Sequence, residues 1–338
     1  MKYSAKISAI TLATFSLVVI ACHAQEFPFS DVIDTPTVSE AECAAISNAV
    51  WASAEWQERR LGFNVTKSAK GCIRYFPSDN AVGAKTATLF LHGDVIHNGT
   101  NTDKELYDKL GSVKAQTDLA NRLAKTSGMP IVRIARPGTY GSTGMNHKWR
   151  RQPIEAHLVN AAVTKIKEKL GYDRINLAGL SGGGGLVAAL LSLGRTDVNC
   201  AVIGAGATNV KLRMQHYDYL TYSKGNDATG LPLSSVYDPV DHVGEVKPDP
   251  NRRVFSVGDP RDVQVIYSSQ IDYANKLRAA GTPITVLEAQ AFDTNHHQVA
   301  FQAQWVAGWC SKGLTDAEMQ AKLSAPRTTV SGADPNAN

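Results

Sequence analysis

The residues with the clearest chemical meaning lie at positions 179–183, where the sequence reads Gly-Leu-Ser-Gly-Gly. A short apolar run at 175–180 leads directly into them, and a helix-like segment at 186–193 follows. This pattern predicts a strand, a sharp turn with Ser181 at its apex, and a helix. Side chains two positions before and after the serine would collide on so tight a turn, which explains Gly179 and Gly183. The turn would hold the serine hydroxyl clear of the backbone, where it can act as a nucleophile.

A serine is a weak nucleophile at neutral pH, so it needs a base beside it and a carboxylate that orients the base. Asp259 and Asp262 both follow a predicted strand at 253–257. We expect Asp262 to be the acid, because it lies a few residues beyond the strand and just before the next helix. Asp259 is the alternative, although its position also suits a carboxylate that holds the turn through hydrogen bonds to the backbone.

The candidate bases are His296 and His297, which lie between the last predicted strand (284–288) and the last predicted helix (298–311). This placement aims an imidazole at the C-terminal edge of the sheet. We expect His297, which adjoins the helix, to be the base, and His296 is the alternative. Neighbouring side chains point in different directions, and the sequence contains no H-E-x-x-H motif or second His cluster. The two histidines therefore do not predict a metal site.

A site for acyl transfer also needs hydrogen-bond donors where negative charge develops on the carbonyl oxygen. The amide of Gly182, directly after the serine, is one expected donor. The second should come from the loop after the predicted strand at 86–91, which reads His92-Gly93-Asp94. We expect the Asp94 amide to be this second oxyanion-hole donor, with Gly93 letting the backbone approach the substrate. The alternative for these residues is a simple turn at the end of a strand.

Strand-like and helix-like segments alternate from about residue 86 to residue 311, which predicts a mainly parallel sheet covered by helices on both faces. The segment 208–250 breaks this pattern, and we expect it to be a small cap or lid inserted within one domain spanning 25–313. We expect residues 314–338 to form a disordered C-terminal tail. The other predicted strands are 72–76, 131–135 and 200–204, and the other predicted helices are 40–60, 114–127, 153–170 and 267–280.

Charge and composition argue against a nucleic-acid partner. The formal net charge is +4, and it falls by two, to +2, if the segment holding Lys2 and Lys6 is removed. No basic cluster is interleaved with aromatic residues. Arg136, Arg150 and Arg151 are cations that could hold a substrate carboxylate, but we expect them to be solvated or paired, for instance with Glu155.

The first 24 residues have the character of an export signal. Lys2 and Lys6 form a positive region, and the apolar stretch 7–21 is too short to span a membrane comfortably. Cleavage after Ala24 would leave a periplasmic or secreted protein. The alternative is a lipid anchor on Cys22, because the preceding Val-Ile-Ala resembles a lipobox.

Four cysteines remain after such a cleavage, and an oxidising compartment would allow two disulfides with three alternative pairings. We expect Cys43 to pair with Cys72 and Cys200 to pair with Cys310. The latter bond would join a strand to the last helix of the domain. The alternative is four buried free thiols.

Taken in chain order, the residues His92-Gly93, Gly179 to Gly183, Asp262 and His297 resemble the α/β-hydrolase superfamily. The closest likeness is to dienelactone hydrolase and prolyl-oligopeptidase-like catalytic domains, over about residues 70–311. The resemblance implies an α/β-hydrolase fold with Ser181 as nucleophile, His297 as general base and Asp262 as its orienter. It also implies that neither a metal nor an organic cofactor is needed.

Two departures from the family pattern affect the expected function. The segment Gly258 to Asp262 has one residue more than the commonest spacing, which leaves the choice of acid open. The sequence shows no N-terminal propeller, with which oligopeptidases screen their substrates, and this shifts our expectation from peptides to esters. We therefore expect an exported serine hydrolase that cleaves small-molecule carboxylic esters through an acyl-enzyme. The alternatives are a serine peptidase that acts on short peptides and a catalytically silent binding protein.

Overall fold

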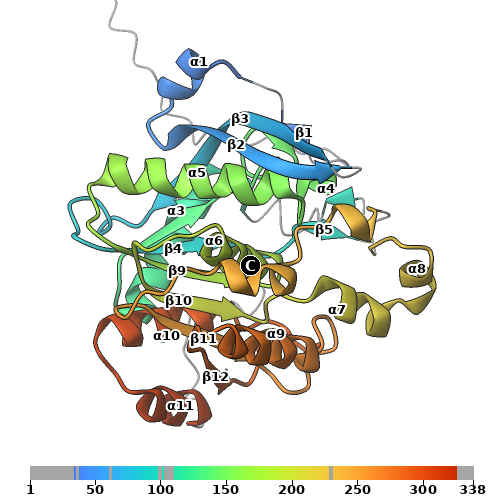
Figure 1. The fold of residues 1–338 in the computed structure, drawn as a ribbon. Helices are drawn as coiled ribbons and strands as arrows, with labels where there is room; N and C mark the ends of the chain where they lie inside the picture. The colour runs from blue at the N-terminus through green and yellow to red at the C-terminus, as the bar shows by residue number, and fades with distance from the viewer. Residues whose placement is uncertain are drawn as a thin grey trace, which may run out of the picture.

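An eight-stranded sheet in the order β12-β11-β10-β9-β4-β7-β3-β2 forms the centre of the molecule (Figure 1). The computed structural model describes residues 34–35, 38–60, 63–97, 101–102, 110–227 and 231–325. The parallel strands are β4 (Thr88–Leu91), β7 (Ile131–Ile134), β9 (Ile175–Leu180), β10 (Val198–Gly204), β11 (Arg253–Gly258) and β12 (Thr285–Glu288). The antiparallel strands are β2 (Ala49–Arg60) and β3 (Phe63–Pro77). The predicted mainly parallel sheet of an α/β-hydrolase fold is confirmed.

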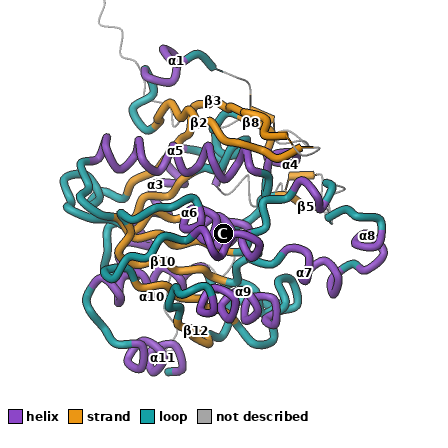
Figure 2. Tube along the Cα trace, in the orientation of Figure 1, coloured by secondary structure: helices purple, strands orange, loops and turns teal. Residues whose placement is uncertain are grey.

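Helices cover both faces of this sheet (Figures 1 and 2). One face is packed by α5 (Pro153–Leu170), α6 (Gly182–Ser192) and α9 (Tyr267–Ala279), and the other by α3 (Val113–Ser127) and α10 (Ala300–Ser311). Alternate residues of β9 supply the two cores, because successive side chains of a strand point to opposite faces: Ile175 and Leu177 join one core, and Ala178 and Leu180 the other. No helix within the described residues combines the length and apolarity that crossing a membrane would require.

The remaining elements are short and lie around the sheet. They are α1 (Glu40–Ala44), α4 (Asn146–Trp149) and the two-residue strands β1 (Asp34–Thr35), β5 (Ile96–His97), β6 (Asn101–Thr102) and β8 (Gly144–Met145). The expected signal segment, 1–24, with its alternative lipid attachment at Cys22, lies outside the described residues.

The expected helix over residues 40–60 is wrong. Only its first turn is helical, and the chain then forms β2, which pairs with β3 along its whole length. Burial alternates along part of the strand, with Ala52 and Trp56 buried and Ser53 and Gln57 exposed, as expected for a half-buried strand. The alanines and glutamates of this segment favour a helix locally, but cross-strand pairing and the stacking of Trp56 on His157 decide the outcome.

The expected disordered tail over 314–338 is also wrong in its first part. Residues Asp316–Ser324 form α11, whose first turn is held by a reciprocal capping box between Thr315 and Glu318. Met319 is fully buried and anchors the helix to the core shared by α3 and α10. Local capping and the burial of Met319 therefore stabilise a helix despite the polar composition of the segment. Residues 326–338 lie outside the described residues.

Helix α11 also covers the edge of the sheet at β12. The Gln320 amide accepts a hydrogen bond from the Glu288 N–H at 2.9 Å and donates one to the Glu288 carbonyl at 3.0 Å. This side chain thus satisfies the two backbone groups that a further strand would otherwise pair.

The segment 208–250 follows the carboxyl end of β10, and its second half packs against α6 and α9 on one face of the sheet. It contains α7 (Val210–Tyr217), α8 (Tyr219–Ser223) and two 3-10 turns, Leu233–Ser235 and Pro239–Glu245. In Figure 1, α7 and α8 lie at the right, past the arrowhead of β10. The Asp238 carboxylate accepts the Val210 N–H at 3.0 Å and the Lys211 N–H at 3.2 Å, which ties the 3-10 turns to the start of α7.

Both expected disulfides are present. Cys43 and Cys72 join α1 to β3 across 29 residues, and Cys200 and Cys310 join β10 to α10 across 110 residues. All four cysteines are buried. The second bond holds the last large helix onto the middle of the sheet.

Removing the disulfides is expected to destabilise the protein in proportion to the loop that each one closes. Cys200→Ala with Cys310→Ala should lower the free energy of unfolding by about 3–5 kcal/mol, and Cys43→Ala with Cys72→Ala by about 1 kcal/mol less, because a longer loop gains more chain entropy in the unfolded state. Urea unfolding of the two double variants measures both losses. An equal or larger loss for the shorter loop would contradict this explanation.

Candidate active site

The strained turn at Ser181 is built by close contacts between backbones. Ser181 has φ 56° and ψ −118° and lies at the start of α6. A Cβ on Gly179 would collide with the Gly183 carbonyl, and a Cβ on Gly183 would collide with the Leu91 carbonyl. The predicted steric reason for both glycines is confirmed. Its cause extends beyond the turn, because Gly183 also touches the end of β4.

The backbone of Ser181 is held by the neighbouring strand β10. Its N–H donates to the Gly204 carbonyl at 2.8 Å, and its carbonyl accepts the Ala207 N–H at 3.0 Å and the Gly185 N–H at 2.9 Å. These bonds offset the unfavourable φ of a non-glycine residue in the left-handed region. The backbone of Ser181 is therefore held in a fixed position, and its side chain remains partly exposed.

The loops after β11 and β12 bring together Asp262 and His297, the residues preferred in the sequence analysis. Asp262 Oδ2 lies 2.8 Å from His297 Nδ1, and both side chains are buried. The other carboxylate oxygen accepts the N–H groups of Gln264 and Val265 at 2.8 and 2.9 Å. These two backbone bonds aim the carboxylate at the imidazole and leave His297 Nε2 as the ring nitrogen that can face a substrate.

The alternative residues Asp259 and His296 form a second, looser pair, with Asp259 Oδ2 3.4 Å from His296 Nδ1. The Asp259 carboxylate accepts bonds from the Arg261 guanidinium at 3.0 Å and from the Ala291 N–H at 2.9 Å. Although burial raises the pKa of Asp259, these bonds hold it at about 2. Asp259 therefore holds the turn, and the His296 side chain is 31% exposed.

The loops that carry Ser181, Asp262 and His297 lie at one edge of the sheet. Backbone bonds continue past the strand ends, from Ala205 N–H to the Val257 carbonyl and from Ala289 N–H to the Gly258 carbonyl. Val299, two residues after His297, packs 3.5 Å from the Cβ position of Gly204, whose carbonyl binds Ser181. Within the described structure, no hydrogen bond joins the Ser181 hydroxyl to the His297 ring.

The loop after β4 lies directly against the serine. A Cβ on Gly93 would be 3.5 Å from Ser181 Cβ. His92 is buried, with Nδ1 2.7 Å from the Gly93 carbonyl, and its Nε2 accepts the Arg136 N–H at 3.3 Å. Burial, helped by the charges of Arg136 and Arg133, lowers the pKa of His92 to about 3. The neutral ring thus donates from Nδ1, accepts at Nε2, and fixes the path of the loop.

The Asp94 side chain is part of a buried charge cluster that the sequence analysis did not find. Its carboxylate lies 2.8 Å from Arg136 and 2.6 Å from Arg151, and Arg136 also binds Glu155 at 2.8 Å, as expected for these residues. Burial raises the pKa of Asp94, but the adjacent arginines outweigh this and hold it well below its usual range. A Cβ on Gly182 would collide with this carboxylate. The two expected oxyanion-hole residues, Asp94 and Gly182, are therefore in contact.

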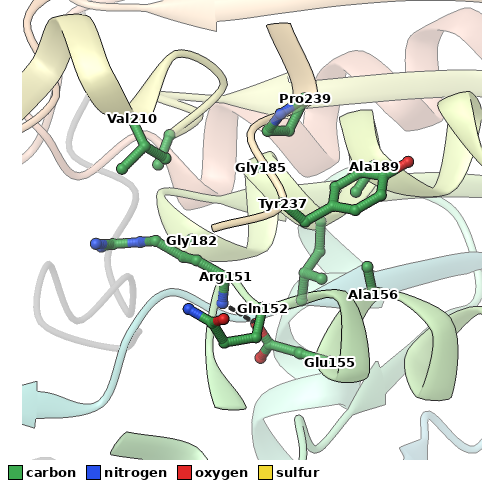
Figure 3. A pocket seen from close by; sticks show the side chains of 12 residues that line it. Arg151, Gln152, Glu155, Ala156, Gly182, Gly185, Ala189, Val210, Tyr237 and Pro239 are labelled. Carbon is green, nitrogen blue, oxygen red and sulfur yellow. Dashed lines mark hydrogen bonds between the residues drawn. The ribbon is translucent and has the colours of Figure 1, made fainter. Parts of the chain in front are cut away.

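A small pocket opens beside Gly182 (Figure 3). Figure 3 shows the Arg151 side chain extending alongside Gly182, near Val210. The other lining residues are mostly apolar: Gln152, Glu155, Ala156, Gly185, Leu186, Ala189, Ala207, Tyr237 and Pro239. The pocket therefore joins the expected oxyanion hole to the segment 208–250, and it has one cationic wall.

Comparison with known sequences identifies one family. The model of the prolyl oligopeptidase family matches residues 139–311, about half of the chain, which include Ser181, Asp262 and His297. No curated protein matches the chain significantly.

The solved structures that are similar to the chain share little of its sequence. The chain is 12% identical to the acylaminoacyl peptidase of Pyrococcus horikoshii, with a TM-score of 0.47, and covers 77% of its own length but 40% of the peptidase. It is 15% identical to an esterase of Pyrococcus furiosus (TM-score 0.47; 87% and 99% covered). It is 11% identical to Est1E of Butyrivibrio proteoclasticus (TM-score 0.48; 79% and 99% covered).

Because His92 is buried as a neutral ring, it should make the protein sensitive to acid. The unfolded chain takes up this proton at the ordinary pKa of 6.5 and the folded protein only at about 3. Between these values the free energy of unfolding falls as pH falls, by at most about 1.4 kcal/mol per pH unit from this group. His92→Asn should therefore show a shallower loss of stability in urea unfolding between pH 7 and pH 4. The exposed His216→Asn is the matched control, and equal slopes in both variants would contradict the assignment.

Proposed function

Because the chain belongs to the prolyl oligopeptidase family and is therefore a serine hydrolase, we propose that it cleaves carboxylic esters with Ser181, His297 and Asp262. The observation that carries this proposal is the 2.8 Å bond between Asp262 and His297 at the sheet edge that also bears the strained Ser181. This is the chain order of nucleophile, acid and base that suits an α/β-hydrolase.

The reaction begins with attack of Ser181 Oγ on the ester carbonyl carbon. His297 Nε2 takes the serine proton, while its Nδ1–H remains donated to Asp262, which stabilises the resulting imidazolium. The amides of Gly182 and Asp94 bind the oxygen that becomes negative. The C–O bond to the alcohol then breaks, and His297 gives its proton to the departing oxygen, which leaves an acyl-enzyme.

Water completes the cycle by the same steps. His297 removes a proton from water, the hydroxide attacks the acyl carbonyl, and the bond to Ser181 Oγ breaks as the serine regains its proton. The bond between serine and imidazole that this needs is often long in a free enzyme and shortens when substrate binds. The close approach of Gly93 to Ser181 supports a role for this loop in the expected oxyanion hole.

The pocket beside Gly182 favours esters with short acyl chains. Most of its lining is apolar, and it is small and partly enclosed by Tyr237 and Pro239. A peptide would need room on both sides of the scissile bond as well as partners for its backbone groups. Short peptides are the second candidate, which the family description supports. The test compares rates on a series of 4-nitrophenyl esters from acetate to octanoate with rates on short peptide amides. The faster class identifies the substrate as ester or peptide.

We also propose that the protein works outside the cytoplasm. The two disulfides support this, because such bonds persist in oxidising compartments. Fractionation of cells that express the full chain, followed by mass measurement of the mature N-terminus, tests both export and cleavage after Ala24.

Substitutions at the two Asp–His pairs should have very different effects. Ser181→Ala, His297→Ala and Asp262→Asn should each lower kcat by about 10³-fold or more, because each removes one part of the same proton-transfer unit. His296→Ala and Asp259→Asn should lower kcat by less than about tenfold, because they alter only the supporting turn. Steady-state kinetics on a short 4-nitrophenyl ester measures these changes.

Labelling with a fluorophosphonate probe gives an independent check. Wild type should be labelled at Ser181, and Ser181→Ala should not. A wild-type protein that resists the probe and shows no turnover would instead indicate a binding protein on this fold. A larger loss for His296→Ala than for His297→Ala would assign the base to the other histidine.

A further inference from the structure

Arg213 is a buried cation on α7 that binds the loop carrying Asp262. It lies on α7, one turn after Val210, which lines the pocket beside Gly182. Its Nε donates to the Gln264 carbonyl at 2.6 Å, in the loop that carries Asp262. Arg213 thus spans from the segment 208–250 to the acid loop, and its side chain is only 8% exposed.

No carboxylate within the described residues lies at ion-pair distance from Arg213. Apart from the Gln264 carbonyl, its guanidinium touches the Met214 sulfur at 3.5 Å and lies 4.8 Å from the centre of the Tyr217 ring. Burial lowers its pKa to about 10, so it is still a cation at neutral pH. A buried charge without a counter-ion in contact is costly, and the described residues place none at ion-pair distance.

The arginines and carboxylates nearest the pocket form ion pairs with one another and not with Arg213. Ion pairs of 4.0 Å or less join three arginines to three carboxylates: Arg136, Arg150 and Arg151 with Asp94, Glu155 and Asp227. Asp262 is engaged by His297 and by backbone N–H groups. Asp94 and Asp262 therefore attract Arg213 only from beyond ion-pair distance.

Arg151 is a second cation, on the side of the pocket. It lines the pocket next to Gly182, and its buried Nε makes no hydrogen bond within the described structure. Besides burial, the charge of Arg151 lowers the pKa of Arg213, as expected for two cations that lie near each other. A negative group placed between them would relieve this repulsion.

We propose that Arg213, with Arg151, binds a carboxylate of the substrate, so that the preferred ester carries a negative charge a few atoms from the carbonyl that Ser181 attacks. This inference rests on the proposed ester hydrolysis. A guanidinium binds a carboxylate well because its N–H groups match both oxygens. The carboxylate can belong to the acyl part, as in a half-ester of a dicarboxylic acid, or to the leaving alcohol.

Matched pairs of charged and neutral esters test the proposal and locate the carboxylate. Mono-4-nitrophenyl adipate is compared with its methyl ester for the acyl side, and 3-acetoxybenzoate with methyl 3-acetoxybenzoate for the leaving side. We expect the charged member of one pair to have the higher kcat/KM by about tenfold or more, the range expected for a charge-assisted hydrogen bond.

Variants of Arg213 separate recognition from support of the acid loop. Arg213→Met should remove the preference by lowering kcat/KM for the charged ester at least about tenfold more than for its neutral partner, mainly through KM. Arg213→Lys should restore part of the preference, because it keeps the charge. Arg122→Met, an exposed cation on α3, removes the same net charge on the other face and should leave the preference intact.

Each outcome has one meaning. Cleavage of both esters at similar rates by wild type overturns the carboxylate site and leaves the proposed hydrolase standing. Equal losses on both esters in Arg213→Met, together with a lower melting temperature, assign the residue to structural support and also overturn the inference. No cleavage of either ester, with no labelling of Ser181, overturns the proposed function and this inference with it.

Discussion

The carbonyl oxygens of Leu91 and His92 occupy the space where a side chain at position 183 would have to lie. This contact joins the turn that carries Ser181 to the end of β4, from which the loop with Asp94 departs. The proposed nucleophile and the proposed oxyanion donors are consequently parts of one packed unit. Any side chain at Gly183 would separate them by pushing backbone against backbone, a displacement that no rotamer change can relieve.

A second constraint acts through charge. The Asp94 carboxylate ties the oxyanion loop to Arg136 near the end of β7 and, through Arg151, to Asp227 in the segment 208–250. Removing one partner from such a buried set leaves an uncompensated charge, which typically costs about 3–5 kcal/mol. The cluster therefore specifies where the loop lies, even where its net contribution to stability is small. Within the described residues, none of the cluster's carboxylates lies at ion-pair distance from Arg213.

Much of the framework could be predicted from local patterns. Local signals, each within a few residues, mark the apolar runs of β9 and β11 and the two ends of α5. The predicted bounds of α5 and β9 are those observed. The bond between Asp262 and His297 follows from two loops that leave neighbouring parallel strands at the same edge. The residues of β2 and α11 were predicted wrongly. The pairing of β2 with β3 and the burial of Met319 on α11 both depend on distant parts of the chain.

The side chains of Asp94 and Arg213 could not be identified from the sequence for a related reason. Asp94 was expected to matter only for its amide, since nothing local indicates that arginines at 136 and 151 surround its carboxylate. The isolation of Arg213 is a property of every surrounding residue together. A missing counter-ion leaves no motif, and only the packed structure reveals it.

The contact between Gln320 and Glu288 has a consequence for the behaviour of the chain in solution. Through this contact, one amide side chain satisfies both the N–H and the carbonyl of Glu288 at the edge strand β12. A polypeptide cut just before Asp316 would keep the strands and loops that carry Ser181, Asp262 and His297. It would expose the backbone groups of Glu288 and the apolar surface under Met319. Such a truncated molecule would expose an unpaired strand edge to other copies of itself. Helix α11 therefore protects the fold against aggregation.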